Sequence, residues 1–289
     1  PFVSLREGLP ERLLKGKASF GQTVAAARRA LEAAGRDAQD VDLIIVATTT
    51  PDRVFPSTAC LLQKRLDRHG CAAFDIQAVC TGFVYALSVA DKFVRTGSAK
   101  CALVVGAETL SRVLDWNDRS TCVLFGDGAG AVVLEASEEP GILSTHLHAD
   151  GAYEHLLSVP GGVSQGYDSL NDGNGFVTMK GNEVFKVAVN TLGRIVDETL
   201  EANNLDKSDI DWLIPHQANL RISQFIQKKF GLSDDQVYNN IMQYGNTTAA
   251  SIPIALTEAW EKGKIKEGDL VVLAAFGSGF TWGSVIIRW

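Results

Sequence analysis

One order of elements occurs twice along this chain, and this repetition constrains the fold more than any other feature. Each half contains a short apolar strand pattern, a helical pattern, and a glycine-rich hairpin that leads into another strand. These segments are 42–47, 80–96 and 126–134 in the first half, and 211–215, 246–261 and 277–287 in the second. Strands that are apolar throughout are typical of sheets covered by helices on both faces. The pattern therefore predicts a duplicated α/β fold, with an N-terminal half over residues 1–142 and a C-terminal half over residues 143–289.

Periodicity and stop signals predict the remaining elements. The expected helices are 21–34, 55–66, 182–203 and 223–230, and the expected further strands are 73–78, 101–107 and 121–125. Gly35 and Gly231 follow helical patterns at the position where glycine commonly ends a helix. Residues 151–174 are rich in Gly, Ser, Asn and Asp without a period, so we expect surface structure that borders a site.

Composition excludes several classes of protein. The chain has 289 residues, 46% of them hydrophobic and 21% charged, which is ordinary for a globular enzyme. Its net charge of −7 argues against nucleic-acid binding. Because no apolar run approaches the roughly 18 residues that span a bilayer and no signal peptide opens the chain, we expect a cytoplasmic protein without membrane attachment. The five cysteines form no C-x-x-C pair, so neither a zinc site nor a disulfide framework is expected.

Cys80 lies where a β-like apolar run changes into a helical pattern. The amino end of a helix presents unpaired N–H groups and a dipole that favours an anion, so we expect this position to lower the pKa of the thiol. A thiolate is the nucleophilic form of cysteine, and the junction therefore predicts covalent acyl chemistry. Two other segments, 215–221 and 244–251, contain the polar side chains that such a nucleophile needs.

Four motifs together resemble the β-ketoacyl-acyl-carrier-protein synthase III family. They are Val79-Cys80-Thr81-Gly82-Phe83, Pro215-His216-Gln217-Ala218-Asn219, Gly245-Asn246-Thr247-Thr248-Ala249-Ala250-Ser251 and Phe276-Gly277-Ser278-Gly279-Phe280-Thr281-Trp282-Gly283. The resemblance covers nearly the whole chain and implies a thiolase-like α/β/α/β/α fold. It implies an acyltransferase that condenses a short acyl-CoA with malonyl-acyl-carrier protein to start type II fatty acid synthesis. The family normally has a further segment, with its first strand, before Phe2.

The resemblance also implies a catalytic triad. Cys80 would take the acyl group, and His216 and Asn246 would hold the thioester oxygen of the malonyl group while CO₂ leaves. Backbone N–H groups at Cys80 and Ser278 would hold the oxyanion, although the family commonly has Gly at the latter position. No metal or redox cofactor is implied, because acyl-CoA and the malonyl carrier protein are substrates.

Further positions match family roles in binding. Six residues would contact CoA: Phe2, Arg6, Arg119, Asn219, Arg221 and Phe276. Phe2 stands where the family has a Trp that stacks on the adenine of CoA. Phe55 matches a residue that reaches across a homodimer and shortens the partner's acyl pocket. A large side chain at that position favours a short primer such as acetyl. A basic patch would dock the acidic acyl carrier protein, and it comprises Lys186, Arg221, Lys228 and Lys229.

Several alternatives remain open from the sequence. Asn246 could serve as a helix N-cap as well as in catalysis. The glycines of 126–130 precede a β-branched strand and not a helix, so a structural role is favoured over dinucleotide binding. The chain could be a starter synthase of secondary metabolism that uses another acyl-CoA. It could also be a carrier-docking module without condensation, or a cysteine thioesterase, for which Asn246 is a poor base.

Overall fold

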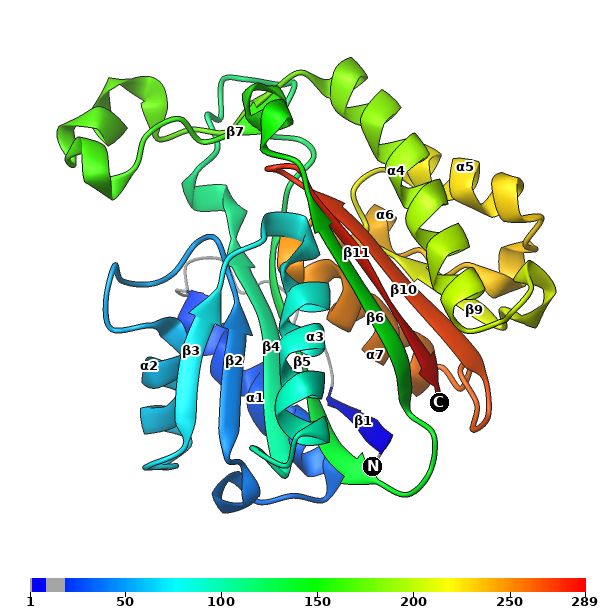
Figure 1. The fold of residues 1–289 in the computed structure, drawn as a ribbon. Helices are drawn as coiled ribbons and strands as arrows, with labels where there is room; N and C mark the ends of the chain where they lie inside the picture. Colours follow the sequence, from blue (N-terminus) through cyan, green and yellow to red (C-terminus); the bar gives the residue numbers. More distant parts are fainter. Residues whose placement is uncertain (1, 9–18) are drawn as a thin grey trace.

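Two sheets form the framework of the molecule. The computed structural model describes residues 2–8 and 19–289, with side chains from Gly21 onwards except those of residues 171 and 172 (Figure 1). The first sheet has the order β1-β5-β4-β2-β3, with bounds Phe2–Gly8, Asp127–Ser137, Cys101–Thr109, Leu43–Ala47 and Ala72–Ile76. The second has the order β6-β11-β10-β9, with bounds Ile142–Ala149, Thr281–Arg288, Leu270–Gly277 and Trp212–Pro215. A small separate sheet pairs β7 (Leu157–Ser158) with β8 (Thr178–Met179).

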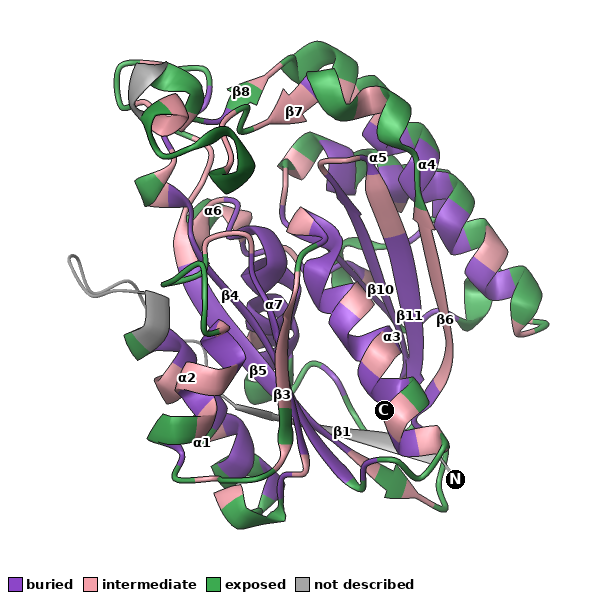
Figure 2. Ribbon diagram, turned by 60° about the vertical axis from the view of Figure 1, so that its left-hand side comes forward, coloured by how far each residue is buried: buried purple, intermediate pink, exposed green. Residues whose placement is uncertain are grey.

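Helices cover both sheets and fill the space between them. They are α1 (Ser19–Ala34), α2 (Thr58–Arg65), α3 (Gly82–Arg95), α4 (Gly181–Ala202), α5 (Leu220–Phe230), α6 (Ile241–Tyr244) and α7 (Ser251–Glu261). Successive residues of β2 point to opposite faces, so Ile44 packs with α1 and α2 while Ile45 packs with α3 and α7. The same central cluster reaches Leu273 of the second sheet, whose other face lies under α4 and α5. The predicted α/β/α/β/α layering is therefore confirmed (Figure 2).

Several predicted elements agree with the structure. Gly35 and Gly231 end α1 and α5 in the left-handed region, with φ of 63° and 67°.

Within the described residues, 2–8 and 19–289, no helix combines the length and the apolar character that crossing a bilayer requires.

Several predicted elements differ from the structure for local reasons. The helix expected from residue 223 begins at Leu220, because the Asn219 side chain caps it by accepting the Arg221 N–H at 2.9 Å. The helix expected from Phe55 begins at Thr58, because the Ser57 side chain caps it by accepting from the Cys60 N–H at 3.2 Å. The strand expected over 121–125 is a series of turns, because the Asp118 carboxylate accepts from the Thr121 hydroxyl at 2.7 Å and bends the chain. The helix expected from residue 246 begins at Ser251, after a 3₁₀ turn over Thr248–Ala250.

The glycines at 126–130 do not form a hairpin, since β5 starts at Asp127 and runs through most of them. A Cβ at Gly130 would lie 2.9 Å from Pro253 Cβ, and one at Gly106 of β4 would lie 2.3 Å from the Ala249 carbonyl oxygen. Both distances are shorter than atoms can approach without movement. The glycines therefore let the 248–261 segment lie directly against the sheet, which is the structural role favoured from the sequence.

Candidate active site

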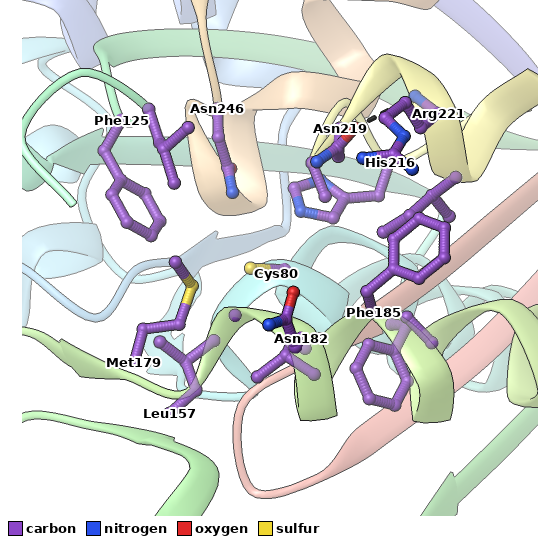
Figure 3. Close-up of a pocket in the computed structure, with 18 of the residues that line it drawn as sticks. Cys80, Phe125, Leu157, Met179, Asn182, Phe185, His216, Asn219, Arg221 and Asn246 are labelled. Carbon is purple, nitrogen blue, oxygen red and sulfur yellow. Dashed lines mark hydrogen bonds between the residues drawn. The ribbon is translucent and has the colours of Figure 1, made fainter. Parts of the chain in front are cut away.

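Cys80, His216 and Asn246 line one cavity of about 350 Å³. Cys80 lies in the 3₁₀ turn Val79–Thr81 before α3, His216 directly follows β9, and Asn246 follows α6. Figure 3 shows the three side chains pointing into the same space. Cys80 thus meets two residues that lie more than a hundred positions further along the chain, which the order of the motifs alone does not establish.

The turn that carries Cys80 is held tightly against the end of β10. Val79 has a φ of 48°, an unusual value for a β-branched residue that indicates local strain. A Cβ at Gly277 would lie 2.8 Å from the Cys80 nitrogen, so only glycine permits this approach. The backbone N–H groups of Cys80 and Ser278 both lie near the sulfur and favour its charged form. The Ser278 hydroxyl donates to the Leu157 carbonyl, so its hydrogen is already used in this bond.

The expected lowering of the Cys80 pKa is contradicted. Burial raises the pKa of the thiol to about 12, the nearby Glu108 carboxyl adds to the rise, and the two backbone N–H groups offset it only in part. Cys80 is 4% exposed, so the lost hydration of a thiolate outweighs the favourable dipoles around it. The sequence argument considered the helix end and did not anticipate this burial.

Glu108 is an acidic residue near Cys80 that sequence reasoning missed. It lies at the end of β4, fully buried, and its carboxyl accepts from the Thr49 N–H at 3.1 Å and the Thr49 hydroxyl at 2.9 Å. Burial raises the pKa of Glu108 to about 7 despite these hydrogen bonds. An acidic residue within an otherwise apolar strand is the sequence signal that could have identified it.

His216 is a neutral ring at the cavity wall. It is 5% exposed, and burial lowers its pKa to about 3. Its Nδ1 lies 2.6 Å from the Ser251 hydroxyl, whereas its Nε2 is buried without a hydrogen-bond partner among the described residues. Nε2, the ring nitrogen without a hydrogen-bond partner among the described residues, therefore faces the cavity.

Asn246 is not at the N-cap position of a helix, because the 3₁₀ turn Thr248–Ala250 has Thr247 at that position and α7 begins only at Ser251. The Asn246 Oδ1 accepts the Thr248 N–H at 2.9 Å, which resembles capping of the following 3₁₀ turn. This bond fixes the side chain so that the amide nitrogen is directed into the cavity (Figure 3). The residue can thus hold the turn and present an N–H donor at the same time.

Three of the expected CoA-contact residues, Asn219, Arg221 and Phe276, line the cavity. Asn219 caps α5, since its Oδ1 accepts the Arg221 N–H at 2.9 Å. The Arg221 guanidinium lies over the Phe185 ring, 5.5 Å from its centroid, so an exposed cation stands at the cavity wall. Arg119 is exposed and lies beside Ser120, which lines the cavity, but is not itself a lining residue.

Other expected residues lie away from the cavity. Phe55 is 82% exposed on the segment before α2. Phe2 and Arg6 fall in β1, where they pair with Ser137 and Val133 of β5. Phe2 therefore lies at the C-terminal end of β5, which is Ser137. The side chains of Phe2 and Arg6 are outside the described part of the chain.

The lysines expected to dock the carrier protein are on the outer helices. Lys186 of α4 and Lys228 of α5 are exposed. Lys229 is also on α5, but its ammonium group lies 2.6 Å from the Asp197 carboxylate. The charge of Lys229 is therefore already partly balanced within the chain.

An apolar wall of the cavity was not identified from the sequence. It consists chiefly of Leu157, Met179, Phe185, Ala188 and Leu192. The last three belong to the apolar face of α4, whose helical spacing was the available signal. The expectation that 151–174 borders a site is confirmed by Leu157, which lies in β7. Across the described residues, no three His, Cys, Asp or Glu side chains are grouped as a metal site.

Comparisons with known proteins place this geometry in a family. The family model described as 3-oxoacyl-[acyl-carrier-protein (ACP)] synthase III matches residues 74–151, and the model of its C-terminal part matches residues 200–289. The chain is 65% identical to the β-ketoacyl-[acyl-carrier-protein] synthase III of Thioalkalivibrio sulfidiphilus, over 99% of this chain and 90% of that relative. It is 57% identical to the enzyme of the same name from Xanthomonas campestris pv. campestris, over 100% of this chain and 89% of that relative.

Solved structures agree with the sequence relatives. The crystal structure of 3-oxoacyl-[acyl-carrier-protein] synthase III from Aquifex aeolicus has a TM-score of 0.90 at 47% identity, over 96% of this chain and 87% of that chain. Because these matches extend over nearly the whole chain, it belongs to the 3-oxoacyl-[acyl-carrier-protein] synthase III family.

Proposed function

We propose that this chain condenses a short acyl-CoA with malonyl-acyl-carrier protein, the reaction that starts type II fatty acid synthesis. The observation that carries the proposal is the meeting of Cys80, His216 and Asn246 in one cavity. The relatives described above are named as synthases of this kind, which supports the acyltransferase activity. The roles of individual residues follow from the geometry of the cavity.

In the first half-reaction, the Cys80 sulfur attacks the acyl-CoA carbonyl. A new thioester forms on Cys80, the bond to the CoA sulfur breaks, and the thiol proton ends on CoA. The backbone N–H groups of Cys80 and Ser278, both near the sulfur, stabilise the oxyanion of the tetrahedral intermediate. Because burial raises the thiol pKa, proton loss accompanies the attack and does not precede it.

In the second half-reaction, the malonyl carrier protein loses CO₂ and becomes an enolate. The N–H groups of neutral His216 and of Asn246 donate to the thioester oxygen, on which the negative charge develops. The enolate carbon then attacks the acyl-Cys80 carbonyl, and the carbon–sulfur bond to Cys80 breaks. The products are a β-ketoacyl carrier protein and a Cys80 thiolate, which takes a proton from water.

Substrates enter past Arg221, whose guanidinium suits the phosphates of CoA and of the phosphopantetheine arm. Asn219 and Phe276 line the same passage. We expect Lys186 and Lys228 to attract the acidic carrier protein more than Lys229, because Asp197 already pairs with the latter.

A homodimer fits the exposed edge of the first sheet. β3 is the last strand of that sheet, and its residues are partly exposed whereas those of β2 are all buried. Phe55 is exposed to solvent and lies three residues before Thr58, whose N–H donates to the Asp75 carboxylate of β3 at 2.7 Å. We expect Phe55 to enter the partner's acyl pocket and to limit the primer to acetyl. The division at residue 142, a cytoplasmic location and the lack of a cofactor remain predictions from the sequence.

Intact-protein mass spectrometry with a panel of acyl-CoA primers tests the proposal. With acetyl-CoA alone, one acetyl group should be found on the Cys80 peptide, and adding malonyl-acyl-carrier protein should yield the β-ketoacyl carrier protein. Cys80→Ser should show neither result. Preference for a bulkier primer would instead indicate a starter synthase of secondary metabolism.

The same experiment separates the other classes of function. A carrier-docking module would leave Cys80 unlabelled by acetyl-CoA. A thioesterase would acetylate Cys80 and release acetate without forming a ketide product. Formation of the β-ketoacyl product excludes both.

A further inference from the structure

Ser251, the first residue of α7, contacts the side of His216 that faces away from the cavity. Its hydroxyl oxygen lies 2.6 Å from His216 Nδ1 and also 3.3 Å from the Gln217 backbone nitrogen. Ser251 is 2% exposed and His216 is 5% exposed, so solvent does not compete for either group. The orientation of the Ser251 hydroxyl can therefore be deduced from its protein partners.

The Gln217 N–H can only donate, so it occupies one lone pair of the Ser251 oxygen. The hydroxyl proton then needs an acceptor, and His216 Nδ1 is the one found among the described residues. If Nδ1 carried a proton, the Ser251 oxygen would accept two bonds and its own proton would be buried without a partner. Among the described residues, the Nδ1–H tautomer would thus leave two groups unpaired, the Ser251 hydroxyl proton and Nε2, whereas the other tautomer leaves only the Nε2–H, which faces the cavity. An unprotonated Nδ1 is therefore favoured.

A neutral imidazole has one proton, and burial keeps His216 neutral. With Nδ1 unprotonated, that proton is on Nε2. Nε2 is the ring nitrogen without a hydrogen-bond partner among the described residues, in the cavity that Cys80 and Asn246 share. The ring thus offers a free N–H donor where the proposed reaction develops negative charge on oxygen.

We propose that Ser251 is a positioning residue that holds the proton of His216 on Nε2 by donating its hydroxyl to Nδ1. The role rests on the proposed function of His216, because a donor at Nε2 is useful only if an oxygen there gains charge. Ser251 itself touches no reacting atom.

Nitrogen-15 NMR of histidine-labelled protein tests the tautomer without any catalytic step. The chain has five histidines, so His216→Gln identifies the relevant signals by their loss. The parent should show a protonated Nε2 and an unprotonated Nδ1 at His216. Ser251→Ala should give a mixture of tautomers, and Ser251→Thr, which keeps the hydroxyl, should restore the parent pattern. A protonated Nδ1 in the parent, or an unchanged Nε2–H tautomer in Ser251→Ala, would overturn the inference.

Kinetics separates this role from general support of the fold. Ser251→Ala should slow malonyl decarboxylation about tenfold to hundredfold, less than full loss of an oxyanion donor, while changing acetylation of Cys80 by less than about twofold. The double variant Ser251→Ala/His216→Ala should be no slower than His216→Ala alone. The control Ser88→Ala removes another buried hydroxyl, one that contacts Thr145 away from the cavity, and should change neither step.

Additive losses in the double variant, or equal losses in both half-reactions, would contradict the inference. If Ser251→Ala unfolds, the nitrogen-15 NMR spectra of the parent and of Ser251→Thr still decide which tautomer His216 adopts. If the parent makes no ketide product, the proposed function fails, whereas an Nε2–H tautomer that depends on Ser251 would still stand.

Discussion

At the scale of single residues, the cavity joins a buried thiol to two neutral donors. Burial raises the Cys80 pKa and lowers that of His216, so neither group is charged in the free enzyme at neutral pH. A stable thiolate–imidazolium pair is therefore not expected. His216 and Asn246 are better suited to stabilise an oxygen anion than to activate the thiol in advance.

His216→Ala and Asn246→Ala test this separation of roles. Each should reduce malonyl decarboxylation by about 10²–10³-fold, the usual effect of losing one oxyanion donor, while Cys80 acetylation changes by much less. Radiolabelled acetyl transfer and CO₂ release measure the two steps separately. Normal decarboxylation by either variant would show that its assigned role is wrong.

Glu108→Gln tests the pKa of the buried carboxyl. Burial raises that pKa from 4.5 to about 7, so folded Glu108 holds a proton that the unfolded chain has lost between these values. The stability that this group contributes is complete below pH 4.5 and is lost as pH rises through 7, by about 3 kcal/mol at most. The Gln variant does not titrate, so its melting temperature relative to the parent should rise from pH 5 to pH 8. A difference independent of pH would contradict the assignment.

At the scale of elements, local signals predicted much of the chain but not its turns. Gly35 and Gly231 ended helices as expected, because the left-handed position after a helix favours glycine whatever the surroundings. The apolar content of 121–125 wrongly suggested a strand, since the Asp118 carboxylate folds that segment. The rise in the Cys80 pKa could not be predicted, because it depends on packing contributed by distant segments.

The close contact between β4 and the 248–250 turn gives a prediction at this scale. Gly106→Ala should destabilise the protein by about 3 kcal/mol or more and impair decarboxylation, because its Cβ would meet the Ala249 carbonyl oxygen at 2.3 Å. Gly21→Ala in α1 is the matched control, with nothing within 4 Å of the added Cβ, and should stabilise by up to about 1 kcal/mol. Urea denaturation measures both changes. Equal effects of the two substitutions would contradict the packing argument.

At the scale of the whole molecule, the layers explain why the site needs both sheets. Cys80 precedes a helix between the sheets, and His216 follows a strand of the second sheet. The repeated order of elements predicted a duplicated α/β fold, whereas the α/β/α/β/α layering was expected from the family resemblance. The meeting of the side chains was expected from the family resemblance and not from the pattern.

Phe55→Asp tests the proposed homodimer. Sedimentation velocity should show a dimer for the parent and a shift toward monomer for the variant, because a carboxylate would be buried at the interface. Phe225→Asp is the matched control, since Phe225 is 46% exposed on α5, far from the β3 edge, and should leave the dimer intact. A parent that sediments as a monomer would contradict the proposal.

The most direct test of the central claim follows the acyl group through a single turnover. The parent enzyme is mixed with acetyl-CoA and then with malonyl-acyl-carrier protein, and the Cys80 peptide and the carrier protein are weighed by mass spectrometry at each time. We predict that acetyl appears on Cys80 first and disappears as the β-ketoacyl carrier protein forms. If ketide product formed without acetyl-Cys80, or if Cys80→Ser made it equally well, the claim that the acyl group passes through Cys80 would be contradicted.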